Sequence, residues 1–182
     1  MINKILILSL LLALPLTLQA ETASYPLVDI IDGDTLLVSI DGKQHKIQLL
    51  GIDAPEDVDN AKLKHDIGRT GLSAEQLLPL GKLATDFLKQ QLSPNASVTL
   101  EGKLAARDRY SRIPAVVMDS EGQNINALMV AEGYAVVLGR YPLAQPLKQT
   151  LQTQEQSAMQ EQQGLWGSHR QLMRQWSGKG DQ

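Results

Sequence analysis

Three β-rich runs follow the first twenty residues of the chain, and a tight turn joins the last two of them. The runs cover residues 27–31, 35–40 and 44–52, and Asp41-Gly42 is a strong signal for a two-residue hairpin. Two more short β-rich runs follow at residues 97–101 and 113–118. Five short strands with helices inserted and appended predict a mainly β, α+β fold, and a five-stranded barrel of the OB type fits this count.

Three segments have the apolar spacing of helices. Residues 74–92 carry apolar side chains at helical intervals, and Pro79 and Gly81 indicate that the continuous helix begins near Leu80. Residues 125–132 form a second predicted helix, which Gly133 ends as a C-cap. Residues 146–163 open on Pro146 and predict an amphipathic, mostly exposed helix.

The remaining segments lack such a pattern. Residues 53–73 are charged and aperiodic, so we expect a long solvated loop there, and we expect residues 177–182 to be frayed. The predicted helix 146–163 contains seven glutamines, so a disordered low-complexity tail is the alternative for it. Leu165-Trp166 favours the helix, because disordered tails lack such an apolar anchor.

Composition removes several classes of protein. The 182 residues include no cysteine, which excludes disulfide scaffolds, thiol nucleophiles and cysteine-bound zinc. The three histidines are too scattered for a helix-borne metal pair, so any metal would be bound by oxygen. With 17 basic and 20 acidic side chains, the chain lacks the broad basic surface typical of nucleic-acid binders, although it has room for a local cationic site.

The first twenty residues differ from the rest of the chain. Lys4 precedes a run from Ile5 to Leu14 that is apolar except for Ser9, and Ala20 is a suitable last residue before cleavage. The run is shorter than the roughly 20 residues that a membrane-spanning helix needs. We therefore expect a secretory signal peptide over residues 1–20, with an uncleaved anchor as the alternative. Residues 21–182 would be a single monomeric domain, periplasmic or secreted, without stable membrane association after cleavage.

Four carboxylates stand at the ends of the first predicted strands. Asp32 and Asp34 precede the second strand, and Asp53 and Glu56 follow the third. The hairpin would bring the start of the second strand beside the end of the third, so Asp34 would lie next to Asp53. Two adjacent carboxylates need a cation, and Ca²⁺ accepts several hard oxygen ligands in loose geometry. Glu56, held in a stiff turn by Pro55, could act as a general base on water.

Simpler readings exist for these groups. Asp32-Gly33-Asp34-Thr35 is also a good turn sequence, and Glu56 could be a solvated loop residue. The densest basic stretch of the chain, residues 107–112, could likewise be a solvated face, although guanidinium groups suit phosphate oxygens. A carboxylate-bound metal combined with arginines is a chemistry suited to phosphodiester hydrolysis.

Five segments resemble the staphylococcal-nuclease-like, or thermonuclease, family, and they occur in the family's order. They are VDIIDGDT (28–35), LLGIDAPE (49–56), DRYSR (108–112), NALMVAEG (126–133) and GLW (164–166), together covering about residues 25–168. The resemblance implies an OB-fold barrel with about three helices. It also implies Ca²⁺-dependent endonucleolytic cleavage of DNA and/or RNA by attack of water on phosphorus.

The resemblance also implies roles for individual residues. The carboxylates of Asp34 and Asp53 and the backbone carbonyl of Ala54 would bind Ca²⁺. Glu56 takes the position of the general base, and Arg112 that of a catalytic arginine. The remaining positions would contact substrate phosphates and sugar (Arg109, Tyr110) or support the metal carboxylates (Asp32, Thr35).

Two positions depart from the family's pattern. Gln48 stands where the family has an arginine, and losing a fixed charge that faces the transition state costs about 3 to 4 kcal/mol. Lys46 would share a strand face with Gln48, so its ammonium could replace that charge; an ordinary surface lysine is the alternative. Gly139 stands where the family prototype has a tyrosine, and Tyr141, two residues on, could contact the substrate instead.

We therefore expect an exported Ca²⁺-dependent nuclease that is slowed by Gln48. One alternative is a nucleic-acid-binding or protein-binding module that keeps the barrel without the catalysis. Another is an exported Ca²⁺-binding protein. The binding-module alternative gives no role to the metal carboxylates, the base and Arg112 as a set. The Ca²⁺-binding alternative gives no role to Arg109 and Arg112.

Overall fold

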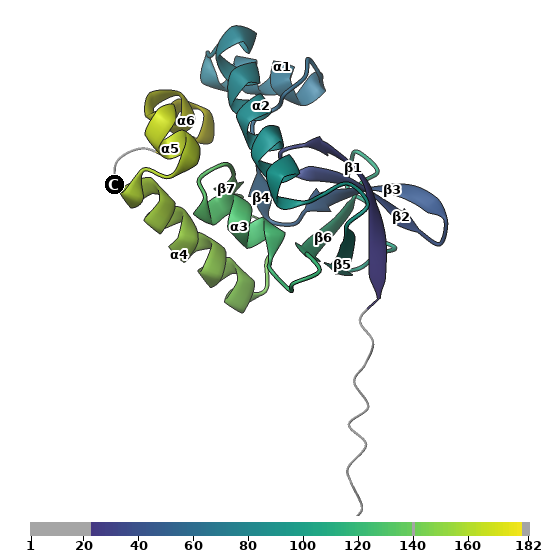
Figure 1. Ribbon diagram of the computed structural model, residues 1–182. Helices are drawn as coiled ribbons and strands as arrows, with labels where there is room; N and C mark the ends of the chain where they lie inside the picture. Colours follow the sequence, from purple (N-terminus) through teal and green to yellow (C-terminus); the bar gives the residue numbers. More distant parts are fainter. Residues whose placement is uncertain (1–22, 140, 180–182) are drawn as a thin grey trace, which may run out of the picture.

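A closed barrel of five strands forms the centre of the molecule in the computed structural model, which describes residues 23–139 and 141–179 (Figure 1). In the order β1-β2-β3-β6-β5, its strands are β1 (Ser24–Asp32), β2 (Thr35–Ile40), β3 (Lys43–Leu49), β6 (Ile113–Met118) and β5 (Ser97–Glu101). All neighbouring strands are antiparallel except β3 and β6, which run parallel. The predicted five-stranded α+β barrel is confirmed. The predicted signal peptide lies outside the described residues.

The opening hairpin forms as predicted, but the third predicted strand is divided. Asp41 and Gly42 both have positive φ angles, 50° and 74°, which suits a two-residue hairpin turn. Thr35 pairs with Gln48, so the start of β2 lies beside the end of β3. Gly51, with φ of 80°, then redirects the chain, and residues 52–53 form a separate strand. This strand, β4 (Ile52–Asp53), pairs with β7 (Val136–Val137) outside the barrel.

Three helices correspond to those predicted: α2 (Ala74–Gln91), α3 (Ile125–Ala131) and α4 (Gln145–Glu161). The predicted start of the first near Leu80 is wrong. The side chain of Ser73 and that of Gln76 form a reciprocal capping box, which starts α2 at Ala74, and the helix continues through Pro79. The capping box provides hydrogen-bond partners for backbone N–H groups at the start of the helix, which have no partner within the helix.

The segment 53–73 is not a continuous solvated loop, contrary to the prediction. Its residues 61–70 form α1 (Ala61–Thr70), where Asn60 caps the start by accepting hydrogen bonds from two backbone N–H groups. Gly71, with φ of 72°, ends the helix. The residues that α1 buries are Leu63 and the charged Asp66, so its inward face does not have the apolar pattern on which the prediction relied.

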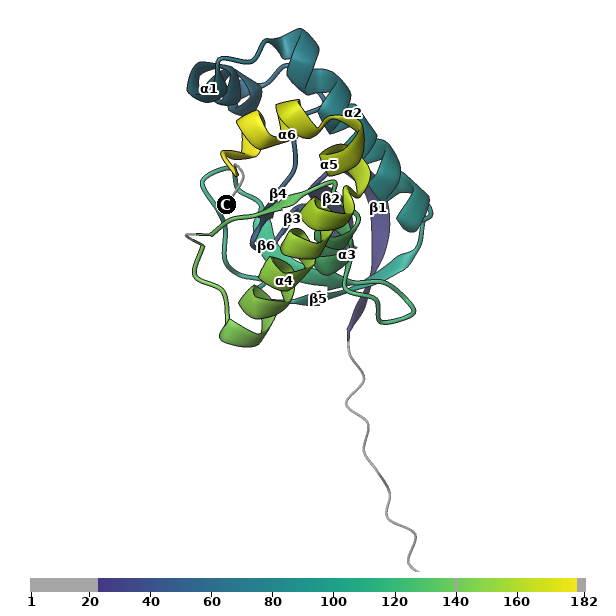
Figure 2. The same ribbon diagram turned by 90° about the vertical axis from the view of Figure 1, so that its left-hand side faces the viewer.

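Two further short helices lie near the end of the chain: α5 (Gly164–Ser168) and α6 (Arg170–Ser177). They complete a second apolar cluster outside the barrel, in which Leu165, Trp166, Met173 and Trp176 are buried. Figure 1 shows α4, α5 and α6 on one side of the barrel, and Figure 2 shows α6 beside α1. The expected fraying is wrong for Ser177, which ends α6. In the described part of the chain, no helix has the length and apolar character needed to cross a membrane.

Candidate active site

Asp34 lies directly beside the peptide that joins Asp53 to Ala54. Its Oδ2 accepts a hydrogen bond of 3.1 Å from the backbone N–H of Ala54, and its Oδ1 accepts one of 3.0 Å from Thr35 Oγ1. Asp32 Oδ1 in turn accepts a bond of 3.0 Å from the backbone N–H of Asp34. Asp34 and Thr35 are buried. The β2–β3 pairing therefore brings together the carboxylates that the sequence assigns to a metal, with Asp32 and Thr35 orienting Asp34.

These carboxylates repel one another in a partly desolvated site. Burial, reinforced by the Asp34 charge, raises the pKa of Asp32 to about 8. Burial also raises the pKa of Asp53 to about 7, with Asp34 adding to the rise and the Lys62 ammonium opposing it. A cluster of this kind is short of positive charge, and a bound cation would relieve the repulsion.

The Lys62 ammonium, which the sequence analysis does not assign to the site, lies among these oxygens. Its Nζ is 2.8 Å from Glu56 Oε1, 3.0 Å from Asp53 Oδ1 and 3.1 Å from the carbonyl oxygen of Ala54. Burial alone would lower the pKa of Lys62, but the charges of Asp53, Asp34 and Glu56 raise it above its ordinary value. The sequence alone does not identify Lys62 as a site residue, because its side chain is directed toward the carboxylates only once α1 has formed.

Glu56 is held from two sides. Its side chain is 6% exposed, and its Oε2 accepts a hydrogen bond from the Asn60 side chain. Its backbone packs against α2 at Gly81, where an added Cβ would lie 2.2 Å from the carbonyl carbon and oxygen of Glu56. Gly81 therefore sets how closely α2 approaches the predicted base, a role that sequence patterning did not reveal.

Arg112 reaches the same carboxylates from the other side. Its Nε donates to Asp108 Oδ2 at 2.8 Å, its Nη1 donates to Thr35 Oγ1 at 3.2 Å, and Nη1 lies 3.9 Å from Asp34 Oδ1. The exposed ring of Tyr110 lies against the guanidinium groups of Arg109 and Arg112, at 4.7 and 5.0 Å. The basic stretch is therefore not a solvated face throughout, because Arg112 is fixed beside the carboxylates.

A cleft of about 440 Å³ opens beside this cluster. Its lining residues include Lys62 and six of the predicted site residues: Gln48, Asp53, Arg109, Tyr110, Arg112 and Tyr141. Buried Gln48 Oε1 has no hydrogen-bond partner among the described residues. Lys46 is exposed on β3, opposite Leu37, and is not among the residues that line the cleft.

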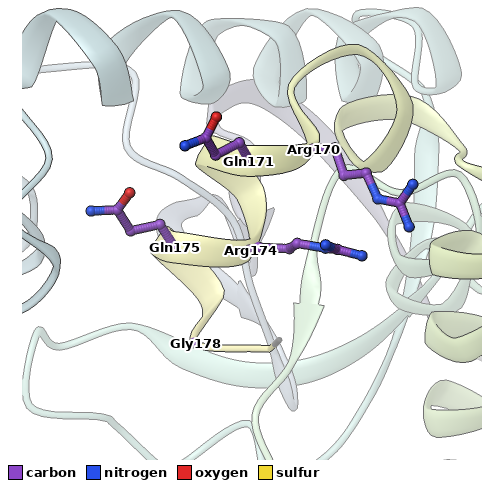
Figure 3. A pocket seen from close by; sticks show the side chains of 5 residues that line it. All are labelled: Arg170, Gln171, Arg174, Gln175 and Gly178. Carbon is purple, nitrogen blue, oxygen red and sulfur yellow. The ribbon is translucent and has the colours of Figure 1, made fainter. Parts of the chain in front are cut away.

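The surface has two further hollows, of which one adjoins the cleft. A groove of about 610 Å³ shares Asp53, Lys62 and Tyr141 with the cleft and continues between α1 and α6. An open hollow of about 570 Å³ on α6 shares no lining residue with either and is lined by Arg170, Gln171, Arg174, Gln175 and Gly178. In Figure 3 the two arginines of this hollow point to one side of α6 and the two glutamines to the other. The predicted site residues that line a hollow belong to the cleft or to its adjoining groove, and none of them lines the hollow on α6.

The donor set fits a hard divalent cation. No group of three or more His, Asp or Glu side chains in the described residues is arranged to hold a metal by itself. Two carboxylates and the Ala54 carbonyl nevertheless offer hard oxygens, and the Lys62 ammonium already lies against two of these groups as a stand-in cation. The remaining coordination positions of a metal here would be filled by water or substrate.

Comparison with known proteins places this site in a family. The family model described as staphylococcal nuclease homologue matches residues 46–168. The chain belongs to this family. The match includes Asp53, Glu56, Lys62 and Arg112, whereas Asp34 precedes it and α6 follows it.

Individual relatives of this staphylococcal nuclease homologue carry nuclease names. The chain is 32% identical over 158 residues to the endonuclease YhcR of Bacillus subtilis (strain 168), covering 85% of this chain and 12% of that protein. It is 34% identical over 118 residues to the thermonuclease of Staphylococcus hyicus, covering 64% and 60% of the two chains. It is also 34% identical over 139 residues to an uncharacterized endonuclease of Escherichia coli, covering 76% and 74%. The chain thus spans well under two thirds of the first of these proteins and slightly under two thirds of the second.

Proposed function

We propose that this staphylococcal nuclease homologue is an endonuclease that hydrolyses phosphodiester bonds of DNA and/or RNA with Ca²⁺ bound in the cleft. The observation that carries the proposal is that Arg112 and the proposed metal ligand Asp34 share hydrogen bonds with the Thr35 hydroxyl. Thr35 Oγ1 donates to Asp34 Oδ1 at 3.0 Å and accepts from Arg112 Nη1 at 3.2 Å. The nuclease names of three relatives support the same reaction class.

The polar residues in and beside the cleft each have a place in such a reaction. Asp34, Asp53 and the Ala54 carbonyl would hold Ca²⁺, which when bound supplies positive charge to a phosphate oxygen. Glu56 accepts the proton of the attacking water as the water oxygen bonds to phosphorus and the bond to the leaving sugar oxygen breaks. Asn60 orients the Glu56 carboxylate for this step.

Arg112 acts on the phosphate. Its guanidinium can donate two parallel hydrogen bonds to phosphate oxygens, and its charge opposes the negative charge that builds in the transition state. Asp108 fixes the orientation of the group through Nε. Arg109, Tyr110 and Tyr141 line the same cleft and would contact the neighbouring phosphate and sugar groups.

Gln48 would slow the reaction. It lines the cleft as a neutral amide, and its Nε2 donates a hydrogen bond of 3.4 Å to the Leu49 carbonyl oxygen. An amide can donate hydrogen bonds to phosphate, but it lacks the fixed charge of an arginine, which is typically worth about 10²- to 10³-fold in rate.

The leader supports action outside the cytoplasm. We propose that residues 1–20 are removed on export and that residues 21–182 act as a monomer in the periplasm or the medium, because the leader has the charge, apolar run and small final residue of a signal peptide. Mass spectrometry of the exported protein tests this: a mature N-terminus at Glu21 is expected, and retention of residues 1–20 on exported material contradicts it.

A cleavage assay tests the proposed reaction. The chain beginning at Glu21 should cleave denatured DNA or RNA with Ca²⁺, and a chelator should stop the reaction. Asp34→Asn and Asp53→Asn should each lose activity, because each removes one metal carboxylate. Absence of cleavage combined with binding of single strands in chelator would instead support the binding-module alternative.

A further inference from the structure

Lys62 places a positive charge among the oxygens proposed for the metal. Its Nζ contacts Asp53 Oδ1 at 3.0 Å and the Ala54 carbonyl oxygen at 3.1 Å, which are two of the three groups that would bind Ca²⁺. It also contacts Glu56, the proposed base, at 2.8 Å. An ammonium and a divalent cation cannot use the same oxygens at this separation, because like charges repel strongly where water is largely excluded.

The fold holds the Lys62 side chain in this position, in contrast to a lysine on the surface. The Lys62 side chain is 20% exposed, whereas Lys64 on the same helix is 71% exposed and pairs with Asp59 at 3.6 Å. Asn60 caps α1 through the backbone N–H of Lys62 and also donates to Glu56. The helix therefore fixes the base of the lysine side chain and one of its carboxylate partners together.

The surroundings of Lys62 balance its charge. Asp66 lies 3.7 Å from Nζ, and the centroid of the Trp176 ring on α6 lies 5.9 Å from Nζ. A buried charge is tolerated only when it is paired, and here the ammonium and the carboxylates compensate one another. Removing the ammonium without adding a cation would leave Asp53 and Glu56 close together with their negative charges uncompensated.

We propose that Lys62 occupies the cation position of the metal-free protein and that Ca²⁺ binds by displacing the Lys62 ammonium. This inference rests on the metal site of the proposed function. A competitor that fills a site nine-tenths of the time weakens the apparent affinity about tenfold, because only the open fraction accepts the ligand. Lys62 would thus stabilise the empty site and raise the metal concentration at which the site fills.

Calorimetric titration with Ca²⁺ tests the displacement on the chain from Glu21. Lys62→Met removes the charge and keeps a flexible apolar stem, and Lys64→Met is the matched control on the same helix. We expect the Kd for Ca²⁺ to fall about tenfold or more in Lys62→Met and to stay unchanged in Lys64→Met. A folded Lys62→Met protein that binds Ca²⁺ with equal or weaker affinity than the wild type would overturn the proposal.

Chemical labelling of the wild-type protein provides a measurement that needs no variant. An amine-reactive ester should modify Lys62 slowly in chelator and at least several-fold faster at saturating Ca²⁺, while the rate at Lys64 stays constant. Peptide mass spectrometry reports both sites in one sample. Equal labelling of Lys62 in the two conditions would contradict displacement.

The two proposals can fail separately. If the wild-type protein cleaves nucleic acid with Ca²⁺ and not in chelator, but Lys62→Met binds Ca²⁺ no more tightly than the wild type, the displacement proposal fails while the proposed reaction stands. If Ca²⁺ binds more tightly to Lys62→Met but no protein cleaves nucleic acid, the displacement stands and the proposed reaction fails.

Discussion

The indole Nε1 of Trp176 donates a hydrogen bond of 3.0 Å to Oδ2 of buried Asp66. This bond joins α6 to α1, two helices whose bonded residues are 110 positions apart in the sequence. Arg69 also donates to Asp66, at 3.1 Å, and Lys62 lies 3.7 Å from it. The end of the chain thereby helps to hold the helix that carries Lys62 against the cleft.

Replacement of Asp66 should have a pH-dependent effect on stability. Burial raises the pKa of Asp66, but the hydrogen bond from Trp176 and the charges of Lys62 and Arg69 outweigh it and hold the pKa below the ordinary 3.8. A carboxyl with a lowered folded-state pKa stabilises the fold above its unfolded-state value and loses that contribution as the pH falls. Asp66→Asn should therefore unfold more easily than the wild type at pH 7, by about 1 to 3 kcal/mol.

Urea denaturation at pH 7 and at pH 3 measures this difference. The gap between wild type and Asp66→Asn should narrow at the lower pH, because pH 3 lies below the ordinary pKa of 3.8, where the unfolded chain takes up a proton at Asp66 more readily than the folded protein does. Trp176→Phe, which keeps an aromatic ring but removes the N–H donor, should also be less stable than the wild type at pH 7. A gap between wild type and Asp66→Asn that stays the same at both pH values would contradict this role for Asp66.

Gly81 should be intolerant of any side chain. An added Cβ would lie 2.2 Å from backbone atoms of Glu56, so Gly81→Ala must push α2 and Glu56 apart. We expect a loss of about 1 to 3 kcal/mol in the free energy of unfolding, together with lower nuclease activity.

Gly68 in α1 provides the matched control, because an added Cβ there meets nothing within 4 Å. Gly68→Ala should stabilise the protein by about 0.5 to 1 kcal/mol, since alanine is the better helix former. Equal effects of the two substitutions would show that the Gly81 contact has no special importance.

Gln48→Arg should accelerate cleavage. The new guanidinium would enter the cleft that Arg112 already lines, where it could face the charge of the transition state. We expect an increase in kcat on the order of 10-fold or more, measured on denatured DNA at saturating Ca²⁺. An unchanged or lower kcat in a folded variant would mean that charge at position 48 is not what limits the rate.

Lys46→Ala tests the other source of charge predicted on β3. If the Lys46 ammonium supplies the missing charge, as its shared strand face with Gln48 predicts, Lys46→Ala should lose most of the remaining activity on denatured DNA. An unchanged rate in this variant would identify Lys46 as an ordinary surface lysine.

Cleavage should require the guanidinium group of Arg112 and not only its positive charge. Arg112→Lys keeps one positive charge but cannot contact Asp108, Thr35 and a phosphate in the same fixed geometry. We expect kcat to fall by roughly 10²-fold in Arg112→Lys. Asp108→Asn, which leaves Arg112 in place with a weaker partner, should cause a smaller fall. Full activity in Arg112→Lys would contradict the proposed phosphate contact.

Local signals explain what could be predicted from the sequence. The hairpin turn depends only on the backbone conformations of Asp41 and Gly42. That turn fixes the register between β2 and β3, which brings Asp34 to the Asp53–Ala54 peptide. The break between β3 and β4 has no such signal, because a positive φ at the single residue Gly51 decides whether β3 continues or a new strand begins.

Distant contacts explain what could not be predicted. The inward face of α1 includes Asp66, whose burial depends on Trp176 near the other end of the chain. Asn60 and Gly71 are local signals for the ends of α1, but the buried Asp66 interrupts the apolar pattern between them. Without the helix nothing directs Lys62 toward the carboxylates. The placement of Gly81 against Glu56 likewise depends on how two segments meet in space.

The most direct test of the proposed reaction compares Glu56→Gln with the wild-type protein at saturating Ca²⁺. The amide keeps the size of the side chain but cannot accept a proton from water, so kcat on denatured DNA should fall by about 10²- to 10⁴-fold. Circular dichroism should show the same fold for both proteins. Cleavage by Glu56→Gln at the wild-type rate would contradict general-base catalysis by Glu56 and the reaction proposed for this cleft.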